Sequence, residues 1–184
     1  MNDQYDKDFY SRNLKFQRAL AAPLVPWIMK NLKFGSVADF GCGCGYLLSQ
    51  LSKGKRDFIG INYNVPENLQ FDKSHFMSAD FTREVILNLK YDLVISLEVA
   101  EHIPEASADT FIMSLVSAAS KYIMFSAATP GQGGVDHVNE QPHEYWHEKI
   151  ENHGFKMRDE IRPVLAGNKS VPFWYRNNIF LYEK

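Results

Sequence analysis

Cysteine is scarce in this sequence: the chain contains only Cys42 and Cys44, separated by a single residue. So close a pair is poorly placed for a disulfide, and no second cysteine pair completes a zinc site. A Gly-x-Ser-x-Gly motif, which would indicate a serine nucleophile, is also lacking. We therefore interpret the two cysteines as small side chains packed in a loop, and we expect no covalent enzyme intermediate.

Long apolar segments and runs of basic residues are lacking as well. No window reaches the ~18 uninterrupted apolar residues of a membrane span, and residues 1–10, MNDQYDKDFY, are too acidic and polar for a signal peptide. We therefore expect a cytoplasmic protein that does not associate with a membrane. The formal charge of −2, without a long Lys/Arg run, argues against binding of duplex nucleic acid and favours a small or locally presented acceptor.

What the chain does contain is an alternation of strand and helix signals without repeats. Its 184 residues, 45% of them hydrophobic, suit one domain. Strands are predicted over residues 36–40, 57–61, 74–79, 92–97, 122–127, 156–163 and 177–184, and helices near 45–53, 82–89, 105–120 and 142–153. Gly154 is the predicted stop of the last helix. The pattern predicts an α/β, Rossmann-like sheet of seven mostly parallel strands with helices on both faces and an antiparallel C-terminal strand.

Residues 1–34 are predicted to form an N-terminal helical cap on the core of residues 35–184. Apolar positions recur at helical spacing from Tyr10 to Leu32. Pro23 and Pro26 lie within this segment, and proline removes a helix hydrogen bond. We therefore expect one or two helices that are broken or kinked at the prolines. At the other end of the chain, residues 164–176 are predicted to form a loop between the last two strands.

The most informative stretch is SVADFGCGCGYLLSQL, residues 36–51, in which Gly41, Gly43 and Gly45 alternate between a strand and a helix. Glycine lets the backbone approach a ligand closely and adopt positive φ, so this is a place to bind a nucleotide-like cofactor. A dinucleotide fingerprint requires Gly-x-Gly-x-x-Gly, but its third glycine position holds Tyr46. An NAD-dependent oxidoreductase or epimerase is therefore a disfavoured alternative.

VADFGCGCG resembles the first motif of class I S-adenosylmethionine-dependent methyltransferases, in which an acidic residue ends the first strand just before the glycines. The resemblance implies that S-adenosyl-L-methionine is the cofactor. It assigns cofactor contacts to Asp39, next to the ammonium group, and to the loop residues Gly41, Cys42, Gly43 and Gly45. The alternative interpretation of Asp39 is a cap on the following turn.

The resemblance continues along nearly the whole chain. Asn62 occupies the position after the second strand where the family usually has an acidic residue that holds the ribose hydroxyls. An asparagine still accepts and donates hydrogen bonds there. Asp80 and Phe81 follow the third strand, where the family contacts adenine, although an aspartate at this point also starts turns. The family's helix between the second and third strands is expected to be shortened, because this segment is polar and contains Pro66.

YDLVISLEVAEHIPE resembles the family's fourth-strand motif and places Glu98, Glu101 and His102 just past the strand. If these residues begin a helical turn, their side chains converge. A similar Glu-x-x-Glu-His arrangement holds a divalent ion in small-RNA 2′-O-methyltransferases and in ubiquinone-biosynthesis O-methyltransferases. The resemblance implies that Glu98 contacts the cofactor, and that Glu98, Glu101, His102 and His137 form a metal site. The alternative is that the motif only borders the cofactor, because many methyltransferases carry it without a metal.

Residues 125–155 follow the fifth strand with TPGQGG and then concentrate polar and aromatic side chains, which predicts an acceptor wall. We expect His102, His137 and Glu140 to be catalytic, because a hydroxyl acceptor needs a base to remove its proton. Asn139 as a helix cap and Trp146 as a core residue are the structural interpretations of this segment. PGQGG, HVNEQ and WYRNNIF resemble an uncharacterised group of short bacterial and phage-type methyltransferases, some associated with glycosyltransferases. This implies O-methylation of a small or saccharide-like acceptor; a non-catalytic cofactor-binding module that regulates a partner is the remaining alternative.

Overall fold

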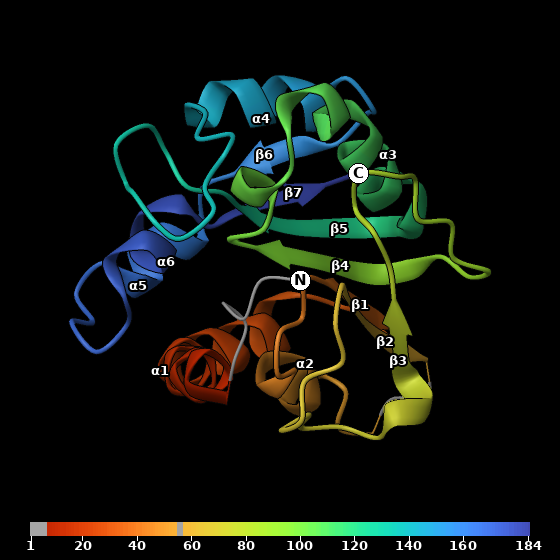
Figure 1. Ribbon diagram of the computed structural model, residues 1–184, viewed down its shortest axis with the longest axis vertical. Helices are drawn as coiled ribbons and strands as arrows, with labels where there is room; N and C mark the ends of the chain where they lie inside the picture. The colour runs from red at the N-terminus through yellow and green to blue at the C-terminus, as the bar shows by residue number, and fades with distance from the viewer. Residues whose placement is uncertain (1–6, 55–56) are drawn as a thin grey trace.

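The computed structural model describes residues 7–54 and 57–184, and it is built around one seven-stranded sheet (Figure 1). The strand order is β3-β2-β1-β4-β5-β7-β6. All neighbouring strands pair in parallel except β7, which runs antiparallel to both β5 and β6. The strands are β1 (Val37–Phe40), β2 (Phe58–Asn62), β3 (Phe76–Ser78), β4 (Tyr91–Leu97), β5 (Ala119–Ser126), β6 (Lys156–Arg158) and β7 (Phe180–Glu183). The predicted fold class is confirmed.

Helices cover both faces of the sheet (Figure 1). The α-helices are α1 (Lys7–Asn31), α2 (Tyr46–Leu51), α3 (Ala108–Ala118), α4 (His143–Glu151), α5 (Ile161–Leu165) and α6 (Phe173–Asn178). Three short 3-10 helices accompany them: η1 (Lys73–His75), η2 (Ala100–His102) and η3 (Glu105–Ser107). One apolar core lies between the sheet and α3 and α4, and a second lies between the sheet and α1, α2 and α5. Within the described residues, no helix has the length and apolar character needed to span a membrane.

The N-terminal segment was expected to form one or two helices, broken or kinked at the prolines, and the structure has a single helix without a break. α1 is one continuous helix of 25 residues with Pro23 and Pro26 inside it. Leu20, Leu24 and Ile28 recur on one face of α1 and are buried against α2 and the sheet. Packing of this face stabilises the helix and offsets the hydrogen bonds that the prolines remove. Residues 1–6 of the predicted cap lie outside the described residues.

Two other predicted elements differ from the structure. Residues 82–89 form no helix, because Asp80 Oδ1 accepts hydrogen bonds from the backbone N–H and the hydroxyl of Thr82, and the Val85 N–H donates to the hydroxyl of Ser114 on α3. These bonds satisfy the backbone in a turn instead. The predicted strand over 74–79 shortens to β3, and its first residues form η1. The segment before it, residues 63–72, contains no helix, as expected.

The C-terminal prediction was also partly wrong. The strand predicted over 156–163 ends at Arg158. Residues Ile161–Leu165 form α5 instead, because Ile161 and Leu165 lie one helical turn apart and are both buried in the second core. α6 begins within the predicted loop, directly after Pro172, and extends over residues 177 and 178, which were predicted as the start of the last strand. Proline supplies a fixed φ at a helix start. The predicted stop at Gly154 is confirmed, since this residue has φ +85° just after α4.

Candidate active site

One cavity of about 690 Å³ lies at the carboxyl ends of the parallel strands, where α/β sheets bind ligands. In Figure 1 this end of β4 points toward α6 and the loop that follows β5. Most of the residues predicted from the sequence line the cavity: Asp39, Gly41, Gly43, Asn62, Asp80, Phe81, Glu98, Glu101, His102 and His137. Cys42, Gly45 and Glu140 are not among the lining residues.

The glycine loop joins β1 to α2 in a conformation that suits glycine. Gly41, Gly43 and Gly45 have φ of +85°, +53° and +75°. At Gly41 the space is also closed, because a Cβ built there would lie 2.2 Å from Cγ2 of Val99. The backbone N–H of Gly41 donates to the carbonyl of Ile61 at the end of β2, over 2.7 Å. The loop is therefore held between β2 and the start of η2.

The two cysteines of this loop point into the protein. Both Cys42 and Cys44 carry free thiols and are buried. Burial raises the pKa of the Cys42 thiol well above its ordinary value and also raises that of Cys44. Thiols with raised pKa values are poor nucleophiles. The interpretation of the cysteines as small packed residues is confirmed.

The side chain of Gln17, on α1, holds the glycine loop through hydrogen bonds. The side-chain amide of Gln17 donates to the carbonyl of Cys42 over 2.9 Å, and its Oε1 accepts from the backbone N–H groups of Tyr46, at 2.8 Å, and Leu47, at 3.3 Å. α2 starts after Gly45, which offers no side-chain cap. Gln17 therefore takes the place of the missing N-cap, and α1 becomes part of the site.

Asp39 lies at the end of β1, beside the glycine loop. Its side chain is buried, and this burial raises the pKa of the carboxyl group from 3.8 to about 7. A carboxylate here is costly unless a positive charge approaches it from the cavity. The predicted alternative of a turn cap is not observed, because α2 receives its hydrogen bonds from Gln17.

Asn62, Asp80 and Phe81 line the end of the cavity formed by β2 and β3. The Asn62 amide donates to the carbonyl of Asn64 over 2.9 Å, so its Oδ1 is the group that faces a ligand as an acceptor. Asp80 starts a turn through Oδ1, and those hydrogen bonds lower its pKa. Phe81 is largely a core residue, with its ring packed against Phe40 and Phe111.

Glu98 follows β4 with φ +55°, a left-handed conformation that is unusual for a residue other than glycine. Its carboxylate accepts from the side-chain amides of Gln132, at 2.8 Å, and Asn178, at 3.4 Å. Burial raises the pKa of Glu98, and these hydrogen bonds act in the opposite direction. The helical turn begins only at Ala100, and Glu98 does not belong to the group of candidate metal ligands that Glu101 and His102 form with His137. It joins the loop after β5 to α6 instead.

Glu101, His102 and His137 do come together. One possible ligand atom from each lies within 4.8 Å of the other two, and the two imidazole rings meet edge to face with centroids 4.9 Å apart. Nδ1 of His102 lies 3.2 Å from the carbonyl of Asp136, and Nδ1 of His137 lies 2.8 Å from Glu140 Oε1. Since both partners accept, each Nδ1 carries a proton, so in the neutral form of either ring Nε2 is the atom with the free lone pair.

Glu101 is the most buried acid of the site. Among the described residues, neither carboxylate oxygen has a hydrogen-bond partner of normal geometry. Burial, and secondly the charge of Glu98, raises the pKa of Glu101 well above its ordinary value, while backbone N–H groups partly offset this. Nε2 of His137 lies 4.0 Å from Glu101 Oε1. The pKa of His102 is lowered by burial and by the neighbouring His137, so its imidazole is neutral near pH 7.

Glu140 acts on the loop after β5, here called the lid loop (residues 127–142). Its two oxygens accept from the backbone N–H groups of Gly131 and Gly133, each over 2.8 Å, and Oε1 also accepts from His137. These bonds lower the pKa of Glu140, the bond from His137 most. Glu140 therefore orients His137 and shapes the lid loop. The core interpretation of Trp146 is confirmed, because this side chain is buried. The interpretation of Asn139 as a helix cap is wrong, because Asn139 is buried three residues before the α4 N-cap, Pro142.

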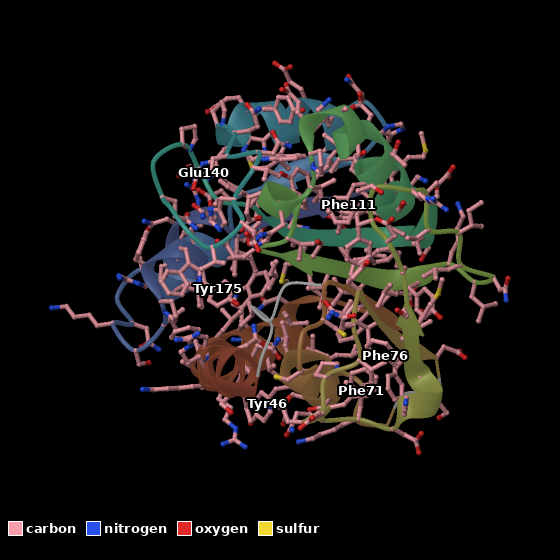
Figure 2. All side chains as sticks on the ribbon, viewed as in Figure 1. Tyr46, Phe71, Phe76, Phe111, Glu140 and Tyr175 are labelled. Atoms are coloured by element: carbon pink, nitrogen blue, oxygen red, sulfur yellow. The ribbon has the colours of Figure 1, made fainter. Side chains whose placement is uncertain are left out.

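Sequence reasoning missed the contributions of α1 and α6. Asn13, Phe16, Gln17 and Leu20 line the cavity from α1, and Phe173, Trp174 and Tyr175 line it from α6. Figure 2 shows Tyr175 on α6 and Glu140 on the lid loop, on the same side of the molecule. A signal for Gln17 was present, because it is a polar residue at helical spacing from the buried Leu20 and Leu24. The aromatic triplet after Pro172 was a comparable signal for α6.

Comparison with known proteins gives a match only at the level of structure. No family model matches the chain, and a search of curated proteins finds no match. Magnesium protoporphyrin IX methyltransferase from Synechocystis, solved with S-adenosylmethionine bound, superposes with a TM-score of 0.67 at 23% identity, over 100% of this chain and 85% of that one. The chain has the fold of a class I S-adenosylmethionine-dependent methyltransferase.

Two further methyltransferases have a similar fold. A methyltransferase from Clostridium acetobutylicum has a TM-score of 0.67 at 11% identity over 91% of each chain. One from Archaeoglobus fulgidus has a TM-score of 0.66 at 17% identity, over 97% of this chain and 100% of that chain. The antiparallel β7 between β5 and β6 separates this methyltransferase fold from the dinucleotide-binding order 3-2-1-4-5-6. The sheet therefore gives no support to the NAD alternative.

Proposed function

We propose that this protein transfers a methyl group from S-adenosyl-L-methionine to a hydroxyl group of a small or saccharide-like acceptor. The observation that carries the proposal is that one and the same cavity is lined by a buried acid beside a glycine loop and by a cluster of two imidazoles and a carboxyl group. The first half suits the cofactor and the second half suits removal of a hydroxyl proton. The methyltransferases of similar fold support the cofactor assignment.

The cofactor end is assigned to residues at the ends of β1, β2 and β3. The Asp39 carboxylate would pair with the cofactor's ammonium, which would supply the positive charge that this buried acid lacks. Asn62 Oδ1 would accept a hydrogen bond from a ribose hydroxyl, and Asp80 would hold the adenine amino group. The glycine loop lets the backbone lie against the ligand. When bound, S-adenosyl-L-methionine supplies an electrophilic methyl group on a sulfonium.

The reactive end removes the proton of the acceptor hydroxyl. The Nε2 atoms of His102 and His137 are the bases, because their Nδ1 protons are held by Asp136 and Glu140. Methyl transfer requires collinear alignment of oxygen, methyl carbon and sulfur, and it requires exclusion of water. The lid loop contributes to both, since Glu140 fixes its backbone and Gln132 fastens it to Glu98.

We further propose that Glu101, His102 and His137 bind a divalent metal ion. The residues fit such an ion because the two carboxylate oxygens of Glu101 are buried without a hydrogen-bond partner of normal geometry among the described residues, and because both imidazoles present Nε2. Metal-ligating histidines typically donate their other N–H to a carboxylate or carbonyl, as these two do. An ion there would occupy the two Nε2 atoms, so it would replace the imidazoles in activating the acceptor hydroxyl, by lowering the pKa of that hydroxyl. Without an ion, the Nε2 atoms act as the bases described above. Glu98 is excluded from this set, since its carboxylate is held by Gln132 and Asn178.

Calorimetric titration of the purified protein tests both proposals. S-adenosylmethionine, S-adenosylhomocysteine and NAD are each titrated in the presence of a chelator, and then Mg²⁺, Mn²⁺ and Zn²⁺ are titrated in its absence. We expect binding of the two adenosyl compounds and not of NAD. Glu101→Gln should abolish metal binding and leave the affinity for S-adenosylhomocysteine unchanged, while Glu105→Gln, an exposed residue on η3, serves as the control. Failure of both adenosyl compounds to bind would contradict the proposed function.

A further inference from the structure

The first turn of α6 places three consecutive aromatic residues along the cavity: Phe173, Trp174 and Tyr175. Tyr175 is buried and Trp174 is partly buried, as expected for residues that anchor a helix. Phe173 is different, because 47% of its surface is exposed although it borders the cavity. An apolar ring exposed at the rim of a cavity is typical of a ligand-binding surface.

The rings of α6 continue into α1. Trp174 meets Phe16 of α1 edge to face, with centroids 5.3 Å apart and the ring planes at 90°. Trp174 also meets Phe173 edge to face, with ring centroids 5.2 Å apart and the ring planes at 81°. These are preferred geometries for aromatic pairs, and together they hold the indole of Trp174 in place. Phe16, Phe173 and Trp174 therefore form one aromatic wall, and the wall is ordered before a ligand arrives.

The aromatic wall borders the same cavity as the polar cluster of Glu101, His102 and His137. Its residues come from α1 and α6, whereas the polar cluster comes from η2 and the lid loop. The cavity therefore offers both flat apolar rings and hydrogen-bonding groups to a ligand. Such a pair of surfaces selects a ligand that has a flat apolar face and a hydroxyl group at its edge.

We propose that the methyl acceptor is a hydroxylated ring whose flat apolar face packs on Phe173 and Trp174 while its hydroxyl group points to the two imidazoles. The inference rests on the proposed function, which it deepens by naming the acceptor class. An aromatic ring and the apolar face of a sugar ring share this chemistry. An open-chain polyol has the hydroxyl groups but not the flat face.

The test uses the protein saturated with S-adenosylhomocysteine and three probes: catechol, methyl β-D-glucoside and glycerol. Dissociation constants are measured by ligand-observed NMR. We expect at least one ring compound to bind about tenfold or more tightly than glycerol, since a ring stacked on an aromatic wall gains on the order of 1 kcal/mol or more. Binding of catechol alone indicates an aromatic acceptor, and binding of the glucoside alone indicates a saccharide.

Substitutions connect this binding to the aromatic wall. Trp174→Ala and Phe173→Ala should each weaken binding of the ring compound about five- to tenfold and leave S-adenosylhomocysteine binding within about twofold. Phe173→Ala keeps the test valid if Trp174→Ala does not fold, because the Phe173 side chain is half exposed. Ile86→Ala, which removes an exposed apolar side chain outside the cavity, is the matched control.

Three results would overturn the acceptor class: glycerol binding as tightly as the rings, ring binding that Phe173→Ala leaves unchanged, or no ring binding to the cofactor-loaded protein. Binding of S-adenosylhomocysteine to the wild-type protein separates a failure of the acceptor class from a failure of the proposed function. If wild-type protein does not bind S-adenosylhomocysteine in the first step, the proposed function fails. If it binds S-adenosylhomocysteine and one of the three results is obtained, only the acceptor class fails.

Discussion

The buried acid at the end of β1 makes a quantitative prediction for Asp39→Asn. Burial raises the pKa of this carboxyl group from 3.8 to about 7, which is about three pH units. At about 1.4 kcal/mol for each unit, ionisation of Asp39 costs the native state about 4 kcal/mol. Because the folded pKa lies above the unfolded one, the native protein binds more protons between these values, and its stability falls as pH rises through this window. Asparagine removes the penalty.

The assay is urea unfolding of wild type and Asp39→Asn at pH 5 and pH 8. Other titrating groups are common to both proteins, so their difference isolates this residue. The free energy of unfolding of the variant relative to wild type should increase by about 2.5 kcal/mol from pH 5 to pH 8. The same variant should lose affinity for S-adenosylhomocysteine at pH 8, because a neutral amide cannot pair with the ammonium. A stability difference that is equal at both pH values would refute the reasoning.

Three other substitutions test the site and its support. Gly134→Ala should abolish metal binding and turnover without unfolding the protein, because a Cβ there would lie 2.2 Å from Nε2 of His137; metal titration and thermal melting check this. Gly41→Ala should weaken S-adenosylhomocysteine binding in calorimetry, because Gly41 has positive φ and the added Cβ would clash with the Val99 side chain. The double variant Gly41→Ala/Val99→Ala removes this clash and should regain part of the affinity. Ser96→Ala should leave the free energy of unfolding unchanged or raise it by about 1 kcal/mol in urea, since no described group bonds to the buried Ser96 hydroxyl; a clear loss would contradict this.

The fold was predictable because its signals are local. The glycine loop, the acid before it and the alternation of apolar strands with amphipathic helices all appear within short stretches, and each of the seven predicted strands has its counterpart. The elements that failed depend on distant contacts. Residues 82–89 lose their predicted helix partly through a hydrogen bond from Val85 to Ser114 on α3, and α1 stays whole because it packs on a remote sheet.

The residues of the site were likewise predictable where their signals are local and not where distant packing places them. Asp39 and the glycine loop lie in one motif, so a resemblance could point to them. The orientation of His137 depends on Glu140, which is three residues away, and that pair was predicted together. Gln17 and Trp174 reach the cavity from opposite ends of the chain. The residues next to them in sequence do not indicate which loop or ring they contact, because the packing of α1 and α6 on the sheet decides these contacts.

The antiparallel strand β7 has a consequence for how the chain is made. β7 follows β6 in synthesis, yet it lies between β5 and β6 and is the neighbour that joins β6 to the sheet. Until residues 180–183 have left the ribosome, the edge of β5 has no strand beside it on that side. An uncovered strand edge is open to pairing with another chain. The topology therefore leaves the β5 edge of the nascent chain open to such pairing until β7 has been synthesised.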